Sequence, residues 1–349
     1  MKHTIKVTFL LAIFFLATQF VGLIIINQYI DHKKTAELHE VVAKPLPLGL
    51  ERPEVENKDY SWVLISATIL VGTLFMLFLI KIKTPFLLKL MYLFSILFTL
   101  SVAFYAFIEN IYIVVPLAFL ITVWRLYRPN LIVQNFSEIF IYGGLAAFFV
   151  SFFNIFSSII LLLVISVYDY VSVYKTKHMV EMAKFQLDSK IFAGFHIPYS
   201  KDKILMNEPM MKKTETKSSS FESSAASSSK SQGASVAVLG GGDIGFTLLF
   251  SGTVMQKLVL FEPLIKGFMI TLIIPVCTTV ALFVLLVKGQ KNKFYPAMPI
   301  VTIGCLIGFV LVMLLSPQFS GEMIAGAIKA YNSLIAGAVN AYNSFLGWF

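Results

Sequence analysis

Three acidic side chains interrupt long apolar stretches of the chain: Glu138, Asp169 and Asp243. Inside a lipid bilayer, a carboxylate costs at least about 2.5–3.5 kcal/mol even on lenient insertion scales. Such residues are therefore expected to perform chemistry, to carry ions or to be paired within the protein. Two carboxyl groups at one site can share a proton, so that one serves as a base while the other serves as an acid.

The composition predicts the bilayer in which these acids lie. Hydrophobic residues make up 57% of the 349 residues and charged residues only 13%, against roughly 25% charged residues in soluble domains. The formal net charge of +9 comes from basic residues in short clusters between apolar runs. This pattern indicates contact with anionic lipid and excludes nucleic acid as a partner. We therefore expect an integral, multi-pass membrane protein.

Nine apolar segments are long enough, or nearly so, to cross about 30 Å of hydrocarbon. They cover residues 5–30, 61–81, 85–108, 110–125, 130–150, 152–174, 236–256, 266–288 and 295–316. The predicted fold class is an all-α membrane protein with about nine transmembrane helices. Its parts are helices one to six in 1–174, a loop in 175–235, helices seven to nine in 236–316 and a tail in 317–349.

Basic residues predict the orientation of these helices. With nine spans the two termini lie on opposite sides, and the side richer in Lys and Arg is expected to be cytoplasmic. The short segments on the N-terminal side carry Lys2, Lys6, Lys81, Lys83, Lys89, Arg125, Arg128, Lys288, Lys291 and Lys293. The other side carries only Lys257, Lys266 and Lys329 in short segments. The N-terminus is therefore predicted to be cytoplasmic and the C-terminus outside.

The loop and the tail have their own patterns. Residues 175–190 predict an amphipathic helix, residues 191–199 are strand-like, and the Ser-rich segment 214–235 predicts disorder. In the tail, the sequence Ala-Tyr-Asn-Ser occurs at 330–333 and again at 341–344. This spacing of three helical turns predicts an amphipathic helix, either at the outer interface or packed on the bundle or a partner.

Depth distinguishes two of the three acids. Asp169 lies six residues before Lys175, the first residue after the sixth segment, and Asp243 lies seven residues after Val236, the start of the seventh. At about 1.5 Å per residue, both lie roughly 9–10 Å from the cytoplasmic end. Two carboxyl groups at matching depth on consecutive antiparallel helices can face each other. Such a pair suits peptide hydrolysis, because the charged member can deprotonate a water while the protonated member polarises the scissile carbonyl.

Two further motifs lie at the same depth. Gly240-Gly241-Gly242-Asp243 places three glycines beside the carboxyl group, which allows close approach of a substrate or a partner helix. Pro296-Ala297-Met298-Pro299 removes two backbone N–H donors near the start of the ninth segment. Such irregular backbone is tolerated at membrane depth where it lines a cavity. Helix packing by the glycines and a simple helix start at the prolines are the alternative interpretations.

Together these motifs resemble those of a known family. Tyr168-Asp169, Gly240-Gly241-Gly242-Asp243 and Pro296-Ala297-Met298-Pro299 are similar, in this order, to the YD, GxGD and PAL motifs of the presenilin and signal peptide peptidase family. Gly241 stands where presenilins usually have Leu, and Met298 replaces the Leu of PAL. The resemblance covers nearly the whole chain, and the predicted orientation is that of presenilins. It is closest to the archaeal, single-chain relatives.

The resemblance implies an intramembrane aspartyl protease in a prokaryotic cell membrane. Asp169 and Asp243 would be the catalytic pair, and single-span transmembrane helices would be the substrates. The loop before the seventh helix would be a place of self-cleavage. Accessory subunits or a homo-oligomer are neither required nor excluded. The residues implied to bind substrate are Tyr168, Gly240, Gly241, Gly242, Pro296, Ala297, Met298 and Pro299.

Other classes of function also follow from the residues. Glu138 together with the two aspartates would suit a proton-coupled transporter, although we find no matching halves in the sequence. Alternatively, Glu138 pairs with Arg125 or Arg128, or forms hydrogen bonds within the bundle. A catalytically silent scaffold would be expected to lack one aspartate. The two cysteines and five histidines have no metal-ligand spacing, so we expect neither metal nor cofactor.

Overall fold

The structure is a computed structural model that describes residues 5–49, 52, 58–82, 85–127, 130–176, 193–198, 236–289, 295–326 and 328. Most of these residues form helices. The longer ones are α1 (Ile5–Gln28), α3 (Ser61–Ile82), α4 (Pro85–Tyr105), α5 (Ile111–Tyr127), α6 (Leu131–Phe149), α7 (Ile155–Val171), α9 (Gly241–Leu258), α11 (Ile273–Lys288) and α12 (Met298–Leu315). The shorter ones are α2 (His32–Leu38), η1 (Pro47–Gly49), η2 (Lys58–Tyr60), η3 (Val150–Phe152), the π-helical turn η4 (Ser172–Thr176) and α10 (Leu264–Thr271).

Seven of the described helical segments are long and apolar enough to cross a membrane. They contain α1, α3, α4, α6, α7, α10 with α11, and α12. Helix α5 is apolar but has only 17 residues. Helix α9 is not among the seven because Asp243, Gln256 and Lys257, together with its glycines and hydroxyl side chains, reduce its mean hydropathy. The mostly helical, multi-pass fold is confirmed, and the count of nine spans stays a prediction.

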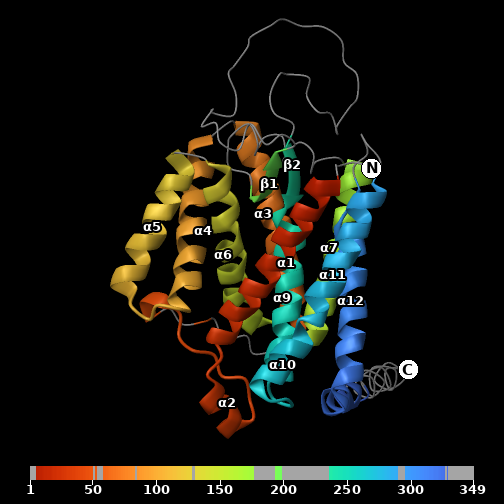
Figure 1. Ribbon diagram of the computed structural model, residues 1–349. Helices are drawn as coiled ribbons and strands as arrows, with labels where there is room; N and C mark the ends of the chain where they lie inside the picture. Colours follow the sequence, from red (N-terminus) through yellow and green to blue (C-terminus); the bar gives the residue numbers. More distant parts are fainter. Residues whose placement is uncertain are drawn as a thin grey trace, which may run out of the picture.

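Helix α1 lies near the centre of the bundle (Figure 1). It packs against α6 on one side and against α9 and α11 on the other, and α12 packs against α7 and α11. The main apolar core joins these helices through buried side chains such as Phe15, Leu248 and Val301. The start of α1 and the end of α12 lie at opposite ends of the bundle (Figure 1), as an odd number of spans requires.

Helices α4 and α5 lie on the outer side of α6 (Figure 1). Helices α4 and α6 approach closely because Gly144 has no side chain. A Cβ atom at Gly144 would lie 2.0 Å from the Thr99 carbonyl oxygen of α4. This small-residue contact brings helix backbones together, which is the usual way that membrane helices associate without a hydrophobic driving force.

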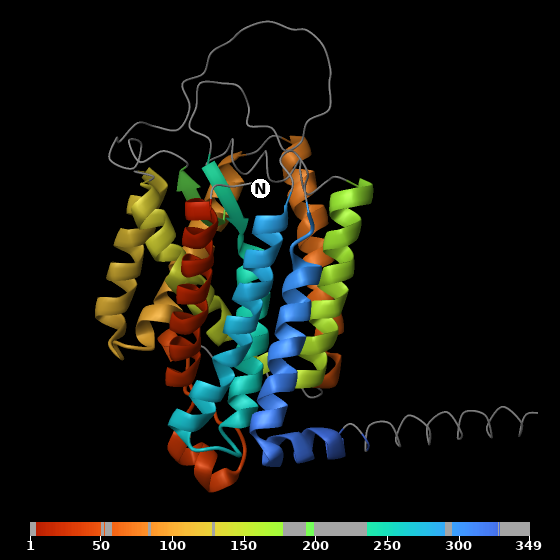
Figure 2. The same ribbon diagram turned by 45° about the vertical axis from the view of Figure 1, so that its right-hand side comes forward.

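A two-stranded antiparallel sheet differs from the all-α prediction. Strand β1 (Gly194–Pro198) pairs with β2 (Val236–Gly240), with Gly194 opposite Gly240 and His196 opposite Val238. The strand-like prediction for 191–199 is confirmed over β1. The prediction that a helix covers 236–256 is wrong over the first five residues, because a short apolar run that contains two valines suits a strand as well as a helix. Figure 2 shows β2 leading directly into α9.

The last predicted segments are also interrupted. The segment predicted at 266–288 is divided at Leu272 into α10 and α11. Pro275 explains the division, because it cannot donate a hydrogen bond to the carbonyl four residues earlier. Beyond α12, residues 317–326 form a further, mostly exposed helix that turns sideways (Figure 2). The predicted amphipathic helix in 175–190 falls almost entirely outside the described residues. The Ser-rich segment 214–235 and the repeats at 330–344 lie wholly outside them.

Candidate active site

Asp169 lies in the last turn of α7, at the end of the bundle where the sheet is found. Its side chain is only 6% exposed. The Oδ2 atom accepts a hydrogen bond of 3.2 Å from the backbone N–H of Met298, and the Ala297 N–H is a second partner of the same carboxyl group. A side chain from one helix thus satisfies the first backbone donors of another. Asp169 therefore caps the start of α12.

This contact explains the Pro296-Ala297-Met298-Pro299 motif. Helix α12 begins at Met298 with Pro299 in its first turn, where a proline without an N–H is tolerated. Ala297, the residue that precedes the helix, supplies no side-chain cap of its own. Of the two interpretations of the prolines, the structure agrees with the helix start, because the segment begins α12. The partial positive charge of that start faces the Asp169 carboxyl group.

Asp243 lies in the first turn of α9, three residues after β2 ends. Gly240 is the N-cap residue, with extended φ and ψ of −66° and 143°. A Cβ atom at Gly240 would be 3.5 Å from Asp243 Oδ2, so the carboxyl group turns back toward the end of the strand. An acid in the first turn is favoured by the helix dipole. The chain therefore changes from strand to helix at the carboxyl group.

The two carboxyl groups lie at the same end of the bundle. Helices α7 and α9 pack against each other and both pack against α12. Asp169 and Asp243 are near enough for their charges to interact. Of the predicted site, the structure thus brings together both aspartates, the glycines and Pro296-Ala297-Met298-Pro299. Tyr168 is directed elsewhere, because its hydroxyl bonds to Thr73 Oγ1 of α3 at 3.3 Å.

Tyr142 of α6 contacts the glycine motif, and the sequence reasoning did not include it. A Cβ atom at Gly241 would lie 2.1 Å from the Tyr142 hydroxyl and 2.9 Å from its Cζ atom. Tyr142 is buried. Residue 241 is therefore glycine because the Tyr142 ring occupies the space that its side chain would need. The sequence gives only a weak signal for a role of Tyr142 at the site, since this chain contains 14 tyrosines.

This contact yields a prediction with a neighbouring control. We expect Gly241→Ala to reduce the activity of the site by about tenfold or more, because overpacking a buried contact costs about 1–3 kcal/mol. Gly242→Ala should have little effect, since a Cβ atom there meets only Phe246, at 3.8 Å. A Tyr142→Ala substitution added to Gly241→Ala should restore part of the loss. Initial rates of the variants test this, and equal rates for the two single variants would refute the steric account.

Glu138 is paired, as one of the two sequence interpretations expected. Its Oε1 atom forms a buried ion pair with Arg125, and the two side chains are 1% and 4% exposed. Arg128 lies outside the described residues. Sequence reasoning missed two polar side chains that also contact the site's elements, Asn135 and Gln19. Gln19 of α1 donates to the Ile244 carbonyl at 3.0 Å and to Thr247 at 2.7 Å. An amide inside an apolar segment was the signal for both.

The fold and the site together define a polytopic membrane protein that brings two intramembrane carboxyl groups to one place. The family model described as "Signal-peptide peptidase, presenilin aspartyl protease" matches residues 49–317. The chain therefore belongs to the signal-peptide peptidase and presenilin aspartyl protease family.

Solved structures show the same fold. A presenilin family intramembrane aspartate protease solved in space group P2 is 16% identical, with a TM-score of 0.53; the match covers 87% of this chain and 96% of that one. A C222 structure of a presenilin family intramembrane aspartate protease is 14% identical, with a TM-score of 0.50; the match covers 86% and 94%. No curated protein matches the chain.

Proposed function

We propose that the chain is an intramembrane aspartyl endopeptidase that hydrolyses peptide bonds of single-span membrane proteins with Asp169 and Asp243. One observation carries the proposal: two carboxyl groups on neighbouring helices lie within electrostatic range of each other at one end of the bundle. Membership of the family supports it. The pairing of Glu138 with Arg125 removes the main support for a proton-coupled transporter, because that carboxylate is already neutralised by a partner.

The proposed chemistry needs one proton shared by the pair. The charged carboxylate takes a proton from a water molecule as the water oxygen attacks the scissile carbonyl carbon. The protonated carboxyl group donates a hydrogen bond to the carbonyl oxygen, where negative charge develops. The C–N bond then breaks, the nitrogen receives a proton from the pair, and the products are a new carboxyl and a new amino terminus. No metal or cofactor takes part in these steps.

The sheet indicates how an extended substrate would reach the pair. The N–H groups of Gly194 and His196 point to α6 side chains, so the ladder bonds to β2 come from the alternate residues Phe195 and Ile197. By the same alternation, Val238 presents its N–H and C=O groups along the other edge of β2, and Gly240 presents its N–H group there, while its carbonyl belongs to the start of α9. Among the described residues, no strand pairs with that edge. We propose that an unwound substrate segment adds there, close to Asp243.

Val238→Pro tests this binding edge. Proline removes the N–H group that would bond a substrate strand but leaves the ladder to β1 intact, and edge positions tolerate it. We expect kcat/KM to fall by about tenfold, the value of one lost hydrogen bond of about 1.4 kcal/mol. Val238→Ala keeps the N–H group and serves as the control. Equal kcat/KM for the two variants would show that substrates bind elsewhere.

The pH dependence of cleavage tests the shared proton. We expect a bell-shaped dependence of kcat/KM between pH 4 and 9, since activity requires one protonated and one charged carboxyl group. The measurement uses the purified protein in detergent and a single-span peptide, with products identified by mass spectrometry. A flat profile over this range would contradict the two-carboxyl mechanism.

The family resemblance and the charge distribution support two further parts of the proposal. The end of the bundle that carries the sheet and both aspartates would face the cytoplasm, as the basic residues of the short loops indicate. The membrane would be the cell membrane of a prokaryote. Cysteine labelling of Lys257→Cys from outside intact cells would test the orientation, because the α9–α10 connection is then expected to be external.

A further inference from the structure

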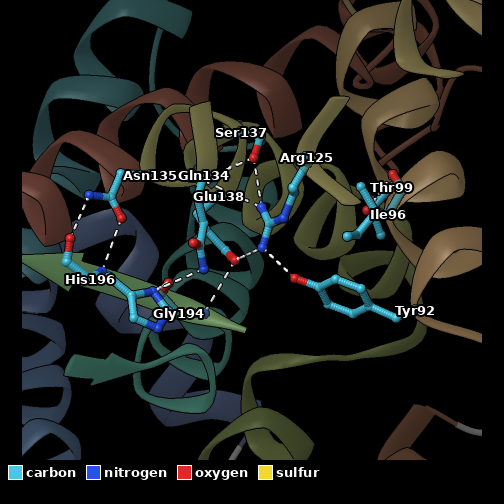
Figure 3. A network of polar contacts seen from close by, with 10 residues as sticks. All are labelled: Tyr92, Ile96, Thr99, Arg125, Gln134, Asn135, Ser137, Glu138, Gly194 and His196. Atoms are coloured by element: carbon cyan, nitrogen blue, oxygen red, sulfur yellow. Dashed lines mark hydrogen bonds and ion pairs between the residues drawn. The ribbon is translucent and has the colours of Figure 1, made fainter. Parts of the chain in front are cut away.

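The outer edge of β1 faces the first turns of α6, where three polar side chains gather (Figure 3). Asn135 and Glu138 lie three residues apart, which places them on the same face of the helix. Both are buried, with exposed fractions of 7% and 1%. Gln134 lies beside them, with its side-chain Nε2 atom 3.0 Å from Nδ1 of the His196 ring. Burying such polar groups at the edge of a membrane bundle is costly unless each is bonded.

The Asn135 amide pairs with the backbone of His196 in the way a neighbouring strand would. The His196 N–H donates to Asn135 Oδ1 at 3.0 Å, and Asn135 Nδ2 donates to the His196 carbonyl at 2.8 Å (Figure 3). An amide side chain has the same donor and acceptor as a peptide group. One residue of α6 therefore satisfies both outward groups of the central residue of β1.

Glu138 and the His196 ring lie against the next residue along the edge. Glu138 Oε1 accepts a hydrogen bond from the Gly194 N–H at 3.2 Å, and His196 Nδ1 lies 3.1 Å from the Gly194 carbonyl oxygen. Arg125 holds the Glu138 carboxylate and also donates to Tyr92 Oη at 2.5 Å (Figure 3). Pro198, the remaining outward residue of β1, has no N–H group. The outer edge of β1 is therefore closed by side chains.

We propose that Asn135 is a positioning residue of the proposed protease, which substitutes for a strand at the outer edge of β1 and thereby fixes the register of β2 and the place of Asp243. The inference rests on the proposed function. The ladder transmits the position of β1 to β2, and only two residues separate the end of β2 from Asp243. Because the β1 edge is closed, the outer edge of β2 is the edge of this sheet at which, among the described residues, an extended segment could add.

The test compares Asn135→Leu with Gln134→Leu in the full chain. Asn135→Leu removes both bonds to the β1 backbone, whereas Gln134→Leu removes the amide beside the His196 ring and leaves both Asn135 bonds in place. We expect kcat/KM to fall at least tenfold in Asn135→Leu and the cut sites in a single-span peptide to spread over neighbouring bonds. Gln134→Leu should keep the wild-type rate and cut sites. Wild-type rate and cut sites in a folded Asn135→Leu variant would overturn the proposal, as would equal effects of the two substitutions.

A second variant and a second measurement keep the inference testable by itself. Asn135→Asp keeps the acceptor for the His196 N–H but loses the donor to the His196 carbonyl, so an intermediate loss of kcat/KM is expected. This variant replaces Asn135→Leu if Asn135→Leu does not fold. Amide hydrogen exchange in residues 193–198 should become faster in both variants and stay unchanged in Gln134→Leu. Unchanged amide hydrogen exchange in the Asn135 variants would overturn the proposal that Asn135 holds the outer edge of β1. Absence of cleavage by the wild type, with exchange altered as expected, overturns only the proposed function.

Discussion

Replacing either Asp169 or Asp243 by asparagine is expected to abolish cleavage of membrane-embedded peptides. Each substitution removes a group that must hold or release a proton, and one such group contributes about 10²–10⁴-fold to the rate. Two groups that act on one proton cannot substitute for each other, so each single variant should fall to the detection limit. Product formation under single-turnover conditions, followed by mass spectrometry, measures the loss.

The fold of these variants is expected to be retained. Asparagine has the volume of aspartate, and its Oδ1 atom can still accept the Met298 N–H where Asp169 now does. Glu109→Gln provides a control, because Glu109 is an exposed acid paired with Lys44 and should leave the rate unchanged. Wild-type rates in either aspartate variant would refute the assignment of the pair.

Replacing Glu138 by alanine is expected to reduce the free energy of unfolding by about 3–5 kcal/mol. The substitution leaves the Arg125 guanidinium buried without its counter-charge and leaves the Gly194 N–H without its acceptor. Glu109→Ala, which breaks the exposed pair with Lys44, should cost only about 0–1 kcal/mol. Unfolding in mixed micelles, followed by circular dichroism, compares the two variants.

A double substitution distinguishes the ion pair from simple packing. Arg125→Met combined with Glu138→Leu removes both charges and keeps much of the volume, so most of the lost stability should return. If the double variant is as unstable as Glu138→Ala alone, the stability comes from shape and hydrogen bonding and not from the pairing of charges.

The sequence was most informative where the physical cost of a residue is highest. Asp169 and Asp243 were recognisable because a carboxyl group is costly in an apolar segment. Their common depth followed from segment boundaries alone, and the structure places both at the same end of the bundle. Arg125, which pairs with Glu138, is one of the two basic partners that the same reasoning predicts for this acid.

The contacts between distant segments could not be predicted in this way. Strand β2 lies in a segment that the sequence predicts as helix, because the run Val236–Gly240 has no periodicity that favours either structure. Its partner β1 lies about forty residues earlier in the chain, and nothing local specifies the pairing.

The two motifs had structural reasons that only tertiary contacts reveal. The glycines were expected to admit a substrate or a partner helix, and Gly241 admits the Tyr142 ring of helix α6. The prolines were expected either to give irregular backbone or to start a helix, and the segment starts α12 under the Asp169 carboxyl group. In both motifs, the residue types indicated an unusual backbone, and the partner that requires it came from another helix.

The most direct measurement is hydrolysis of a single-span peptide by the reconstituted chain in water labelled with heavy oxygen. We expect wild-type protein to yield a product that ends within the membrane segment and carries one heavy oxygen in its new carboxyl group. Asp243→Asn should yield none. An uncut peptide, or equal cleavage by the wild type and Asp243→Asn, would contradict the account of an aspartate pair that hydrolyses peptides in the membrane.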